Sequence, residues 1–307
     1  MEHKRGAYPS YLALLESGEL AARRDRALAM LESCSLCPRA CGVNRLEDEK
    51  GVCRIARRAI VSSAHPHFGE EAPLVGTAGS GTIFFSGCNL KCLFCQNYEI
   101  SHLLAGDETS ANRLAFLMLR IQEMGCHNLN LVTPTHVLPQ ILEALELAAK
   151  GGLRIPIVYN TGGYDSIEAV RLLDGVVDIY MPDVKYLSPE AAAKYSGAVD
   201  YPKVIRGVIR EMHRQVGDLE ISSDGIAARG LLVRHLVMPG MLEDTERIVA
   251  FLAGDISRDT YINVMAQYRP EYLASGHPPL DRPLSRDDWR EAIRLARAAG
   301  LRRIDEC

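Results

Sequence analysis

The amino-terminal part of the chain carries a helical pattern followed by a strand pattern. Between Tyr11 and Leu31, leucines recur at helical spacing, at positions 12, 15, 28 and 31, which predicts a helix over that stretch. The segment AIVSSAHPHFG (59–69) predicts a strand. The next segment, EEAPLVGTAGSG (70–81), contains one Pro and three Gly residues, so we expect a linker or an irregular loop there.

From Gly81 onward, the pattern changes to strand, loop and helix in repetition. Nearly continuous apolar runs fit strands that are covered on both faces, as in a parallel sheet with helices outside. The apolar, β-rich runs that predict strands are TIFFSG (82–87), NLNLV (128–132), IPIVYN (155–160), VVDIYM (176–181), LLVRHLVM (231–238) and TYINVM (260–265).

Amphipathic helices separate these runs. Their apolar stripes are Leu114, Leu117, Met118 and Ile121, and then Leu138, Ile141, Leu142 and Leu145. Residues 201–216 predict a further helix, Ser188 and Ser285 predict two helix starts, and Asp224-Gly225 predicts a turn. Six strands alternating with helices predict a parallel α/β architecture, either an incomplete (β/α) barrel or an open sheet. In both, the functional site lies at the carboxyl ends of the strands.

Composition narrows the class of protein. The 307 residues are 47% hydrophobic and 24% charged, which excludes wholesale disorder. A net charge of -4 argues against a large sequence-independent nucleic-acid surface. No run approaches the roughly 18 apolar residues of a membrane span, and the start MEHKRGAYPS shows no secretory signal. We therefore expect a cytoplasmic protein that does not engage a membrane.

The cysteines carry the strongest chemical signal. Seven of the nine fall between Cys34 and Cys95, and without a secretory signal they are not expected to form disulfides. Thiols spaced two or three residues apart can converge on one metal centre, and a reducing compartment keeps them available as ligands. The pattern is typical of a cytosolic metalloprotein.

Cys88, Cys92 and Cys95, the triad, form C-x3-C-x2-C directly after the first core strand. Cysteine thiolates are the usual ligands of iron–sulfur clusters. Three cysteines on a four-iron cluster leave one iron open to bind a small molecule. The alternative is a zinc site completed by another residue such as Cys126, which is otherwise expected to be a buried small hydrophobe.

Cys34, Cys37, Cys41 and Cys53, the quartet, form C-x2-C-x3-C-x11-C. Four thiolates at such spacing suit a closed structural zinc site, and an auxiliary [4Fe-4S] cluster is equally compatible with them. The Cys-Pro and Cys-Gly steps resemble zinc knuckles, and the segment lacks an obvious second electron-transfer motif. These features favour zinc slightly.

Several strings together carry a family resemblance. The triad with Phe94 before its last cysteine resembles the signature of the radical S-adenosylmethionine (SAM) superfamily. The full set resembles its pyruvate formate-lyase-activating-enzyme-related branch: GTIFFSGCNLKCLFCQN, NLVTPTH, VYNTGGY, DIYMPDVKY, VRHLVMPG, MAQYRP and CSLCPRACGVNR. The resemblance implies a partial (β/α)6 TIM-like barrel at residues 77–307, after a helical and four-cysteine metal-binding segment at residues 1–76.

The resemblance also implies cofactors and an activity. A [4Fe-4S] cluster would bind SAM and cleave it reductively to a 5'-deoxyadenosyl radical, which abstracts hydrogen from a protein, peptide or small molecule. One version is an activase for a glycyl-radical enzyme, and the quartet argues mildly against it. The expected electron donor is of the flavodoxin or ferredoxin kind. The rival class is a non-catalytic iron–sulfur or zinc protein, or an electron carrier.

Two of the SAM-binding segments implied by the resemblance follow the second and fourth strands. The family has a Gly-Gly-Glu-like motif after the second strand, whereas this chain has Thr133-Pro134-Thr135-His136, without the acid that would meet the SAM amino group. Hydroxyls or backbone carbonyls could replace it. After the fourth strand, alternation places Met181, Asp183 and Lys185 on one face, and the pair resembles the Asp-x-Lys that contacts SAM.

The other implied contacts come from three further strands. Asn160 and Thr161 match a position near the ribose, although N-T-G-G is also ordinary turn chemistry. Arg234 and His235 must face opposite sides of their strand, and the resemblance favours Arg234 inward, near the SAM carboxylate. Gln267 is expected near the ribose. Tyr268, Arg269 and His277 could line the substrate mouth or cap a surface loop.

Overall fold

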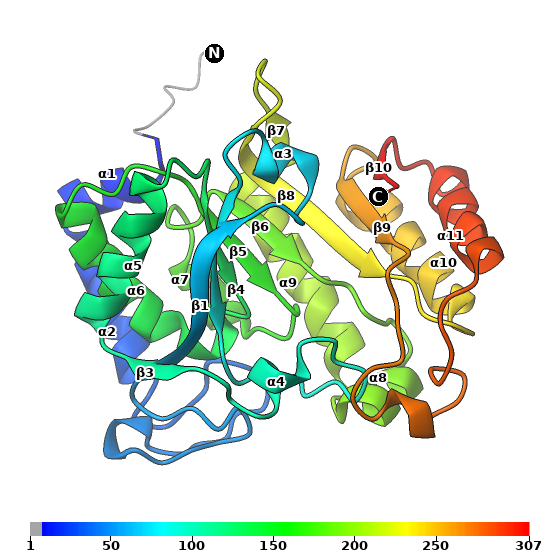
Figure 1. Ribbon diagram of the computed structural model, residues 1–307, viewed down its shortest axis with the longest axis horizontal. Helices are drawn as coiled ribbons and strands as arrows, with labels where there is room; N and C mark the ends of the chain where they lie inside the picture. Colours follow the sequence, from blue (N-terminus) through cyan, green and yellow to red (C-terminus); the bar gives the residue numbers. More distant parts are fainter. Residues whose placement is uncertain (1–7, 307) are drawn as a thin grey trace.

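The computed structural model describes residues 8–306, so residues 1–7 and Cys307 lie outside the described part. Its centre is a twisted, mostly parallel sheet (Figure 1). Six parallel strands lie side by side in chain order: β2 (Ser80–Phe85), β4 (Leu129–Val132), β5 (Ile157–Thr161), β6 (Ile179–Pro182), β8 (Ala227–Leu236) and β9 (Tyr261–Met265). All six predicted strands are confirmed, and the fold is that of a partial TIM barrel.

Four further strands extend or decorate this sheet. The predicted strand β1 (Ala59–His67) lies antiparallel to β2, and β3 (Asp107–Thr109) lies antiparallel to β1. At the other end, β10 (Arg303–Asp305) runs parallel to β9. The short β7 (Glu220–Ile221) forms a hairpin with β8 around the predicted turn. Since β3 and β10 end the strand order, the barrel is not closed.

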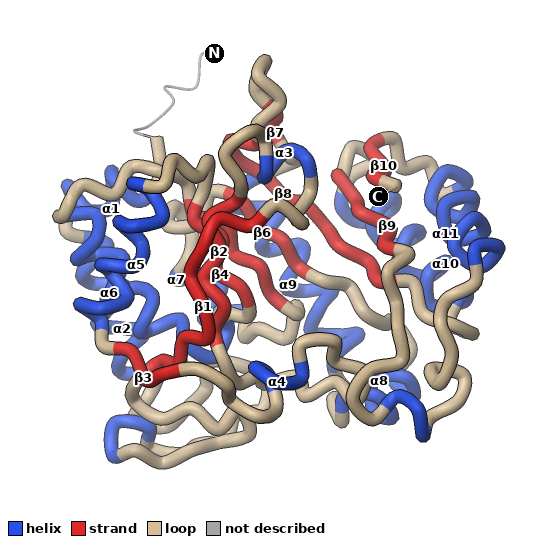
Figure 2. Tube along the Cα trace, in the orientation of Figure 1, coloured by secondary structure: helices blue, strands red, loops and turns tan. Residues whose placement is uncertain are grey.

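Helices cover the outer face of the sheet, as Figure 2 shows. The longer ones are α1 (Tyr11–Glu16), α2 (Glu19–Ala29), α5 (Ala111–Glu123), α6 (Leu138–Lys150), α7 (Ile167–Leu172), α8 (Pro189–Ser196), α9 (Tyr201–Val216), α10 (Leu242–Phe251) and α11 (Arg286–Ala298). Short turns of helix are α3 (Ala72–Val75), α4 (Tyr98–Ser101), Arg45–Glu47, Thr135–Val137, Leu252–Ile256 and Ala274–Gly276. None of the helices in the described chain is long and apolar enough to span a membrane.

Local sequence signals explain several of these boundaries. The Ser188 side chain accepts a hydrogen bond from the backbone of Ala191, and Ser285 does the same for Asp288, which confirms both predicted helix starts. The stretch between Tyr11 and Leu31 is helical, as predicted, but it forms two helices. Gly18 takes a left-handed conformation (φ 78°) and divides that stretch into α1 and α2.

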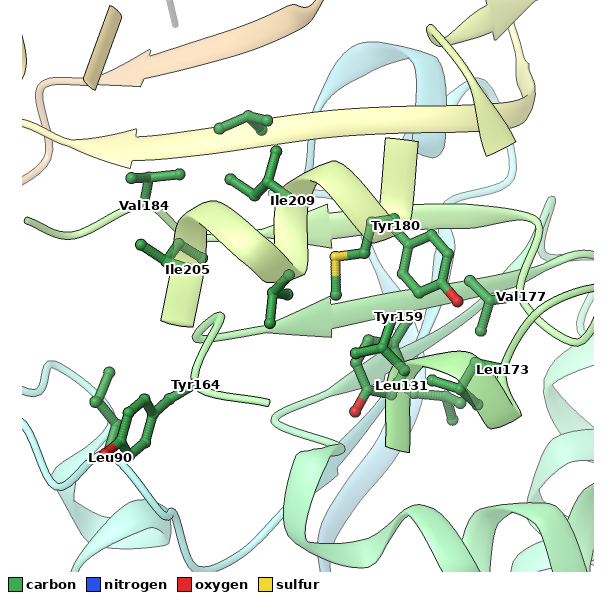
Figure 3. Close-up of a cluster of buried hydrophobic side chains, with 14 of the residues drawn as sticks. Leu90, Leu131, Tyr159, Tyr164, Leu173, Val177, Tyr180, Val184, Ile205 and Ile209 are labelled. Atoms are coloured by element: carbon green, nitrogen blue, oxygen red, sulfur yellow. The ribbon is translucent and has the colours of Figure 1, made fainter. Parts of the chain in front are cut away.

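The two faces of the sheet bury different groups. On the outer face, Tyr159 and Tyr180 pack among apolar side chains of the covering helices, including Ile205 and Ile209 of α9 (Figure 3). On the inner face, Val158, Ile179, Met181 and Leu232 pack around Leu74 of α3. The segment expected to be an irregular linker therefore forms a short helix that fills one end of the barrel.

A buried carboxylate joins the first helix to the sheet. Asp178, directly before β6, accepts hydrogen bonds from the backbone nitrogen of Ser10 (2.9 Å) and from its hydroxyl (2.7 Å). Its other oxygen accepts from the backbone nitrogen of Ile157 (3.0 Å). Burial raises the pKa of Asp178, so these three donors stabilise a carboxylate that has little contact with water.

Asp178→Asn should destabilise the fold. The amide offers one acceptor oxygen and turns an NH2 donor toward a backbone N–H, so we expect the free energy of unfolding to fall by about 1–3 kcal/mol. Urea unfolding at neutral pH measures this change. The exposed turn variant Asp224→Asn is the control and should stay within about 0.5 kcal/mol of wild type. Equal stabilities for the two variants would contradict the tethering role.

Candidate functional site

The triad loop begins at a glycine that no other residue could replace without strain. Gly87 has a φ of +83°, and a Cβ at that position would lie 2.7 Å from the carbonyl oxygen of Cys53. The chain can therefore turn directly after β2 only with this residue in this conformation. The turn places Cys88, Cys92 and Cys95 at the carboxyl edge of the sheet, where parallel α/β folds hold their sites.

Each triad sulfur is paired with a hydroxyl or a backbone N–H. The backbone nitrogen of Leu90 lies 3.4 Å from Cys88 Sγ. Ser196 Oγ donates to Cys92 Sγ at 3.1 Å, and Ser101 Oγ lies 3.1 Å from Cys95 Sγ.

Burial raises the pKa of the Cys92 thiol to about 12, so the protein alone does not favour a thiolate there. A bound cation would supply the missing charge, and the three hydrogen-bond donors fit thiolate ligands.

The position of Cys126 excludes this thiol as a further metal ligand beside the triad. That thiol is 3% exposed and packs beside Gly81, near the start of β2, whereas the triad follows the end of the strand. Six strand residues separate the two places by roughly 20 Å.

A charged pair lies next to the triad. Lys185 Nζ donates to Asp183 Oδ2 at 2.7 Å, and both side chains are mostly buried. Burial lowers the pKa of Lys185, but Asp183 and then the nearby Cys92 outweigh it and raise that pKa above its usual range. The ammonium is therefore a permanent positive charge beside the thiols. Met181 of the same face is fully buried in the apolar inner cluster.

The threonines predicted to meet SAM are held within the protein. Thr161 Oγ1 donates to Asp165 (2.7 Å), and its contact with Thr135 Oγ1 (3.0 Å) completes a buried network. Asn160, its neighbour on the strand, is also buried, at 8% exposure. Thr133 is half-buried at the end of β4, with a left-handed φ of 59°. Of the two threonines after β4, the structure leaves Thr133 the more open to a ligand.

His136 lies against the quartet segment. Its Nε2 is 2.8 Å from the carbonyl oxygen of Ser86, and its own carbonyl accepts from Arg45 at 2.8 Å. The imidazole lines a cavity with the four quartet cysteines. The short helical turn therefore directs the ring to the amino-terminal segment, and the contact of His136 with SAM stays a prediction.

Arg234 is already occupied by carboxylates. Its Nε and Nη2 donate to the two oxygens of Glu71 at 2.7 and 2.6 Å, and Nη2 also pairs with Glu70. Asn263 adds a hydrogen bond to Glu71 at 2.8 Å. Arg234, which we expected to bind the SAM carboxylate, instead binds the carboxylate of Glu71 in the same protein. The sequence did not predict this pair, because residues 70–81 were interpreted as a linker.

The alternation predicted for Arg234 and His235 is present. His235 faces the helices, with Nδ1 2.8 Å from the carbonyl of Val184 and Nε2 2.9 Å from Thr245 Oγ1. Burial lowers the pKa of His235 to about 4, so the ring is neutral at physiological pH. Both ring nitrogens of His235 are thus engaged by groups of the protein.

The loop after β9 closes against the triad loop. Gln267 is exposed, and its carbonyl accepts from Gln96 at 2.9 Å, while Leu273 donates to the carbonyl of Leu93 at 2.9 Å. Tyr268 is buried with its hydroxyl on the Leu280 carbonyl, so it does not line the mouth.

Not every side chain of the loop after β9 that lies near the triad was predicted from the sequence. Arg269 is exposed and His277 is half-buried. Sequence reasoning missed Tyr272, whose ring stacks on His102 at 4.4 Å and on Tyr98 at 5.4 Å, close to the triad. An isolated tyrosine in a polar loop carries no pattern that would have marked it.

Comparisons with known proteins agree with this geometry. Residues 82–252, more than half of the chain, match the model of the Radical SAM superfamily. The chain is also 35% identical over 282 residues to the uncharacterized protein MJ0674 of Methanocaldococcus jannaschii, an alignment that covers 89% of this chain and 76% of that protein.

Ser196→Ala should lower the reduction potential of an iron–sulfur cluster on the triad. The hydroxyl offsets negative charge on the Cys92 sulfur, which favours the reduced state of a cluster. Redox titration followed by electron paramagnetic resonance (EPR) measures the shift. Ser222→Ala, on the exposed β7–β8 hairpin, should leave the potential unchanged. A potential for Ser196→Ala at or above the wild-type value would refute the assignment.

Proposed function

Because the chain belongs to the radical SAM superfamily, we propose that its triad loop is the place where SAM is cleaved and where hydrogen is then taken from a substrate. One observation carries the proposal. Three thiols with a hydrogen-bond partner each converge at the carboxyl edge of the sheet, beside the Lys185–Asp183 pair. The superfamily implies a [4Fe-4S] cluster and SAM as cofactors.

Each residue at the triad loop would have a separate role. Cys88, Cys92 and Cys95 hold the cluster, which when bound supplies the electron that cleaves SAM to methionine and a 5'-deoxyadenosyl radical. Lys185 offsets negative charge beside Cys92, and Asp183 fixes the position of that ammonium. Leu93, held by the backbone of Leu273, keeps the loop closed against the segment after β9.

Access to this site would come from the carboxyl end of the barrel alone. Leu74 and the inner apolar side chains fill the opposite end, and Glu71 binds Arg234 and Asn263 across the interior above them. A substrate can therefore meet the triad only past the loops that follow β4, β5, β6 and β9. Asn160 and Thr133 lie at this end and are our candidates for contacts with SAM; Met181 forms the floor.

We place the chain in the pyruvate formate-lyase-activating-enzyme-related branch on its sequence strings, foremost GTIFFSGCNLKCLFCQN. Within that branch, we favour direct action on a peptide or small molecule over activation of a glycyl-radical protein. The reason is the quartet module at residues 34–53, which a simple activase of this kind does not need.

The remaining proposals concern partners and organisation. A one-electron carrier of the flavodoxin or ferredoxin class would reduce the cluster. Residues 1–76 would form the metal-binding segment and residues 77–307 the catalytic core. A non-catalytic electron carrier would need neither the buried Lys185–Asp183 pair nor the closed loop beside the thiols.

Cys92→Ala should abolish SAM cleavage. The protein is reconstituted with iron and sulfide without air, reduced with dithionite and given SAM, and 5'-deoxyadenosine is measured. We expect wild type to form it and Cys92→Ala to form none, because the cluster loses one of three ligands. Cys126→Ala, a buried cysteine at the far end of β2, is the matched control and should retain cleavage. Cleavage by Cys92→Ala would refute the ligand assignment, and none by wild type would refute the enzyme.

A further inference from the structure

Arg39, in the quartet segment, contacts both the triad loop and helix α8. Its Nε donates to the carbonyl oxygen of Asn89 at 2.9 Å, and Nη2 donates to that of Leu90 at 3.2 Å. Nη2 also donates to the carbonyl of Ser196 at 2.8 Å, and Nη1 donates to that of Gly197 at 2.5 Å. One side chain therefore joins its own segment to two others that lie 50 and 157 residues away along the chain.

The guanidinium is also held on one of its flat faces. The ring of Tyr164 lies against it, with 5.3 Å between the ring centroid and Cζ of Arg39. The hydroxyl of Tyr164 donates to Asp200 at 2.6 Å, and its carbonyl accepts from the side chain of Asn89 at 2.6 Å, so the ring is fixed in turn. A planar guanidinium that binds several carbonyls and stacks on a ring has one orientation, which a lysine ammonium would not reproduce.

The contact with Asn89 orients a hydrogen-bond donor of the triad. The carbonyl of Asn89 and the N–H of Leu90 belong to one planar, trans peptide group, so they point in opposite directions. Arg39 binds the carbonyl side, and the nitrogen on the other side lies 3.4 Å from Cys88 Sγ. The next residue, Lys91, has a left-handed φ of 57°, which a residue with a side chain keeps only where other contacts hold the backbone. Arg39 supplies such contacts.

The contact with Ser196 orients a second donor. Ser196 ends α8, and while its carbonyl accepts from Arg39, its hydroxyl donates to Cys92 Sγ at 3.1 Å. The last carbonyls of a helix have no partner within the helix, and a positive charge is favourable there. Arg39 thus caps α8 at the residue that meets Cys92. Two of the three hydrogen-bond donors of the triad therefore depend on this one side chain.

We propose that Arg39 is a positioning residue for the triad, which sets the hydrogen bonds on Cys88 and Cys92 and thereby the reduction potential of the cluster. Hydrogen bonds to the ligand sulfurs stabilise the extra negative charge of a reduced cluster, so loosening them lowers the potential. Arg39 acts through the peptide group before Leu90 and through Ser196. The inference rests on the function proposed above, since it requires a cluster on the triad, and it is independent of any metal on the quartet.

A double-mutant cycle on the reduction potential tests this role without SAM. Wild type, Arg39→Lys, Ser196→Ala and the double variant are reconstituted with iron and sulfide without air, and each potential is measured by redox titration with EPR. Lysine keeps the positive charge but loses the planar fork, so we expect Arg39→Lys to lower the potential. The same substitution should lower it less in the Ser196→Ala protein, because one of the two donors that Arg39 orients is already absent there.

Arg303→Lys is the matched control. Arg303 also donates to a backbone carbonyl, that of Leu219 at 2.6 Å, and lies over the ring of Tyr261 at 5.5 Å, but it belongs to β10. Its substitution should leave the potential unchanged. A potential for Arg39→Lys at or above the wild-type value, an equal shift in the control, or additive shifts in the cycle would each overturn the proposal.

Failure of the fold and failure of the proposed function give different results. If Arg39→Lys does not fold, Arg39→Gln takes its place, and its cycle with Ser196→Ala decides, because loss of the charge alone would give additive shifts. A wild type that shows these shifts but forms no 5'-deoxyadenosine would contradict the proposed function alone. A wild type that cleaves SAM with a potential insensitive to Arg39 would contradict this inference alone, and a wild type that binds no cluster would overturn both.

Discussion

The triad loop begins where the chain passes very close to the amino-terminal segment. Gly87 turns in a left-handed conformation directly over the carbonyl oxygen of Cys53, with no room for a side chain. This contact joins the end of β2 to the amino-terminal segment. The position of the triad therefore depends on a segment that lies outside the parallel strands, and the two groups of cysteines are held by the same piece of backbone.

Two ion pairs, one partly buried and one largely buried, divide the inner face of the barrel. Lys185 and Asp183 lie beside the thiols, and Arg234 lies between the carboxylates of Glu70 and Glu71. Removing one partner from such a pair leaves an uncompensated buried charge, so each pair is fixed in place. The first pair leaves a positive charge next to the triad, where we propose that the chemistry takes place. The second pair occupies the interior, which would confine that chemistry to the carboxyl end.

The sequence predicted those features that depend on interactions between residues close together along the chain. Continuous apolar runs identified the six parallel strands, and Ser188 and Ser285 marked helix starts, because strand burial and capping act over a few residues. The triad was visible for the same reason. What sequence could not reveal were pairings between distant segments, such as Arg234 with Glu71, 163 residues away, or His136 with the quartet. A residue type shows what a side chain can bind, while the fold decides which partner reaches it first.

The central claim is that three thiolates leave one iron of a cluster open to SAM. Electron–nuclear double resonance of the dithionite-reduced protein, with SAM labelled with ¹⁵N at its amino group, tests it most directly. The account predicts a hyperfine coupling between the cluster and the labelled nitrogen, because that group would bind the open iron. A reduced cluster that shows no such coupling while SAM is bound would contradict it.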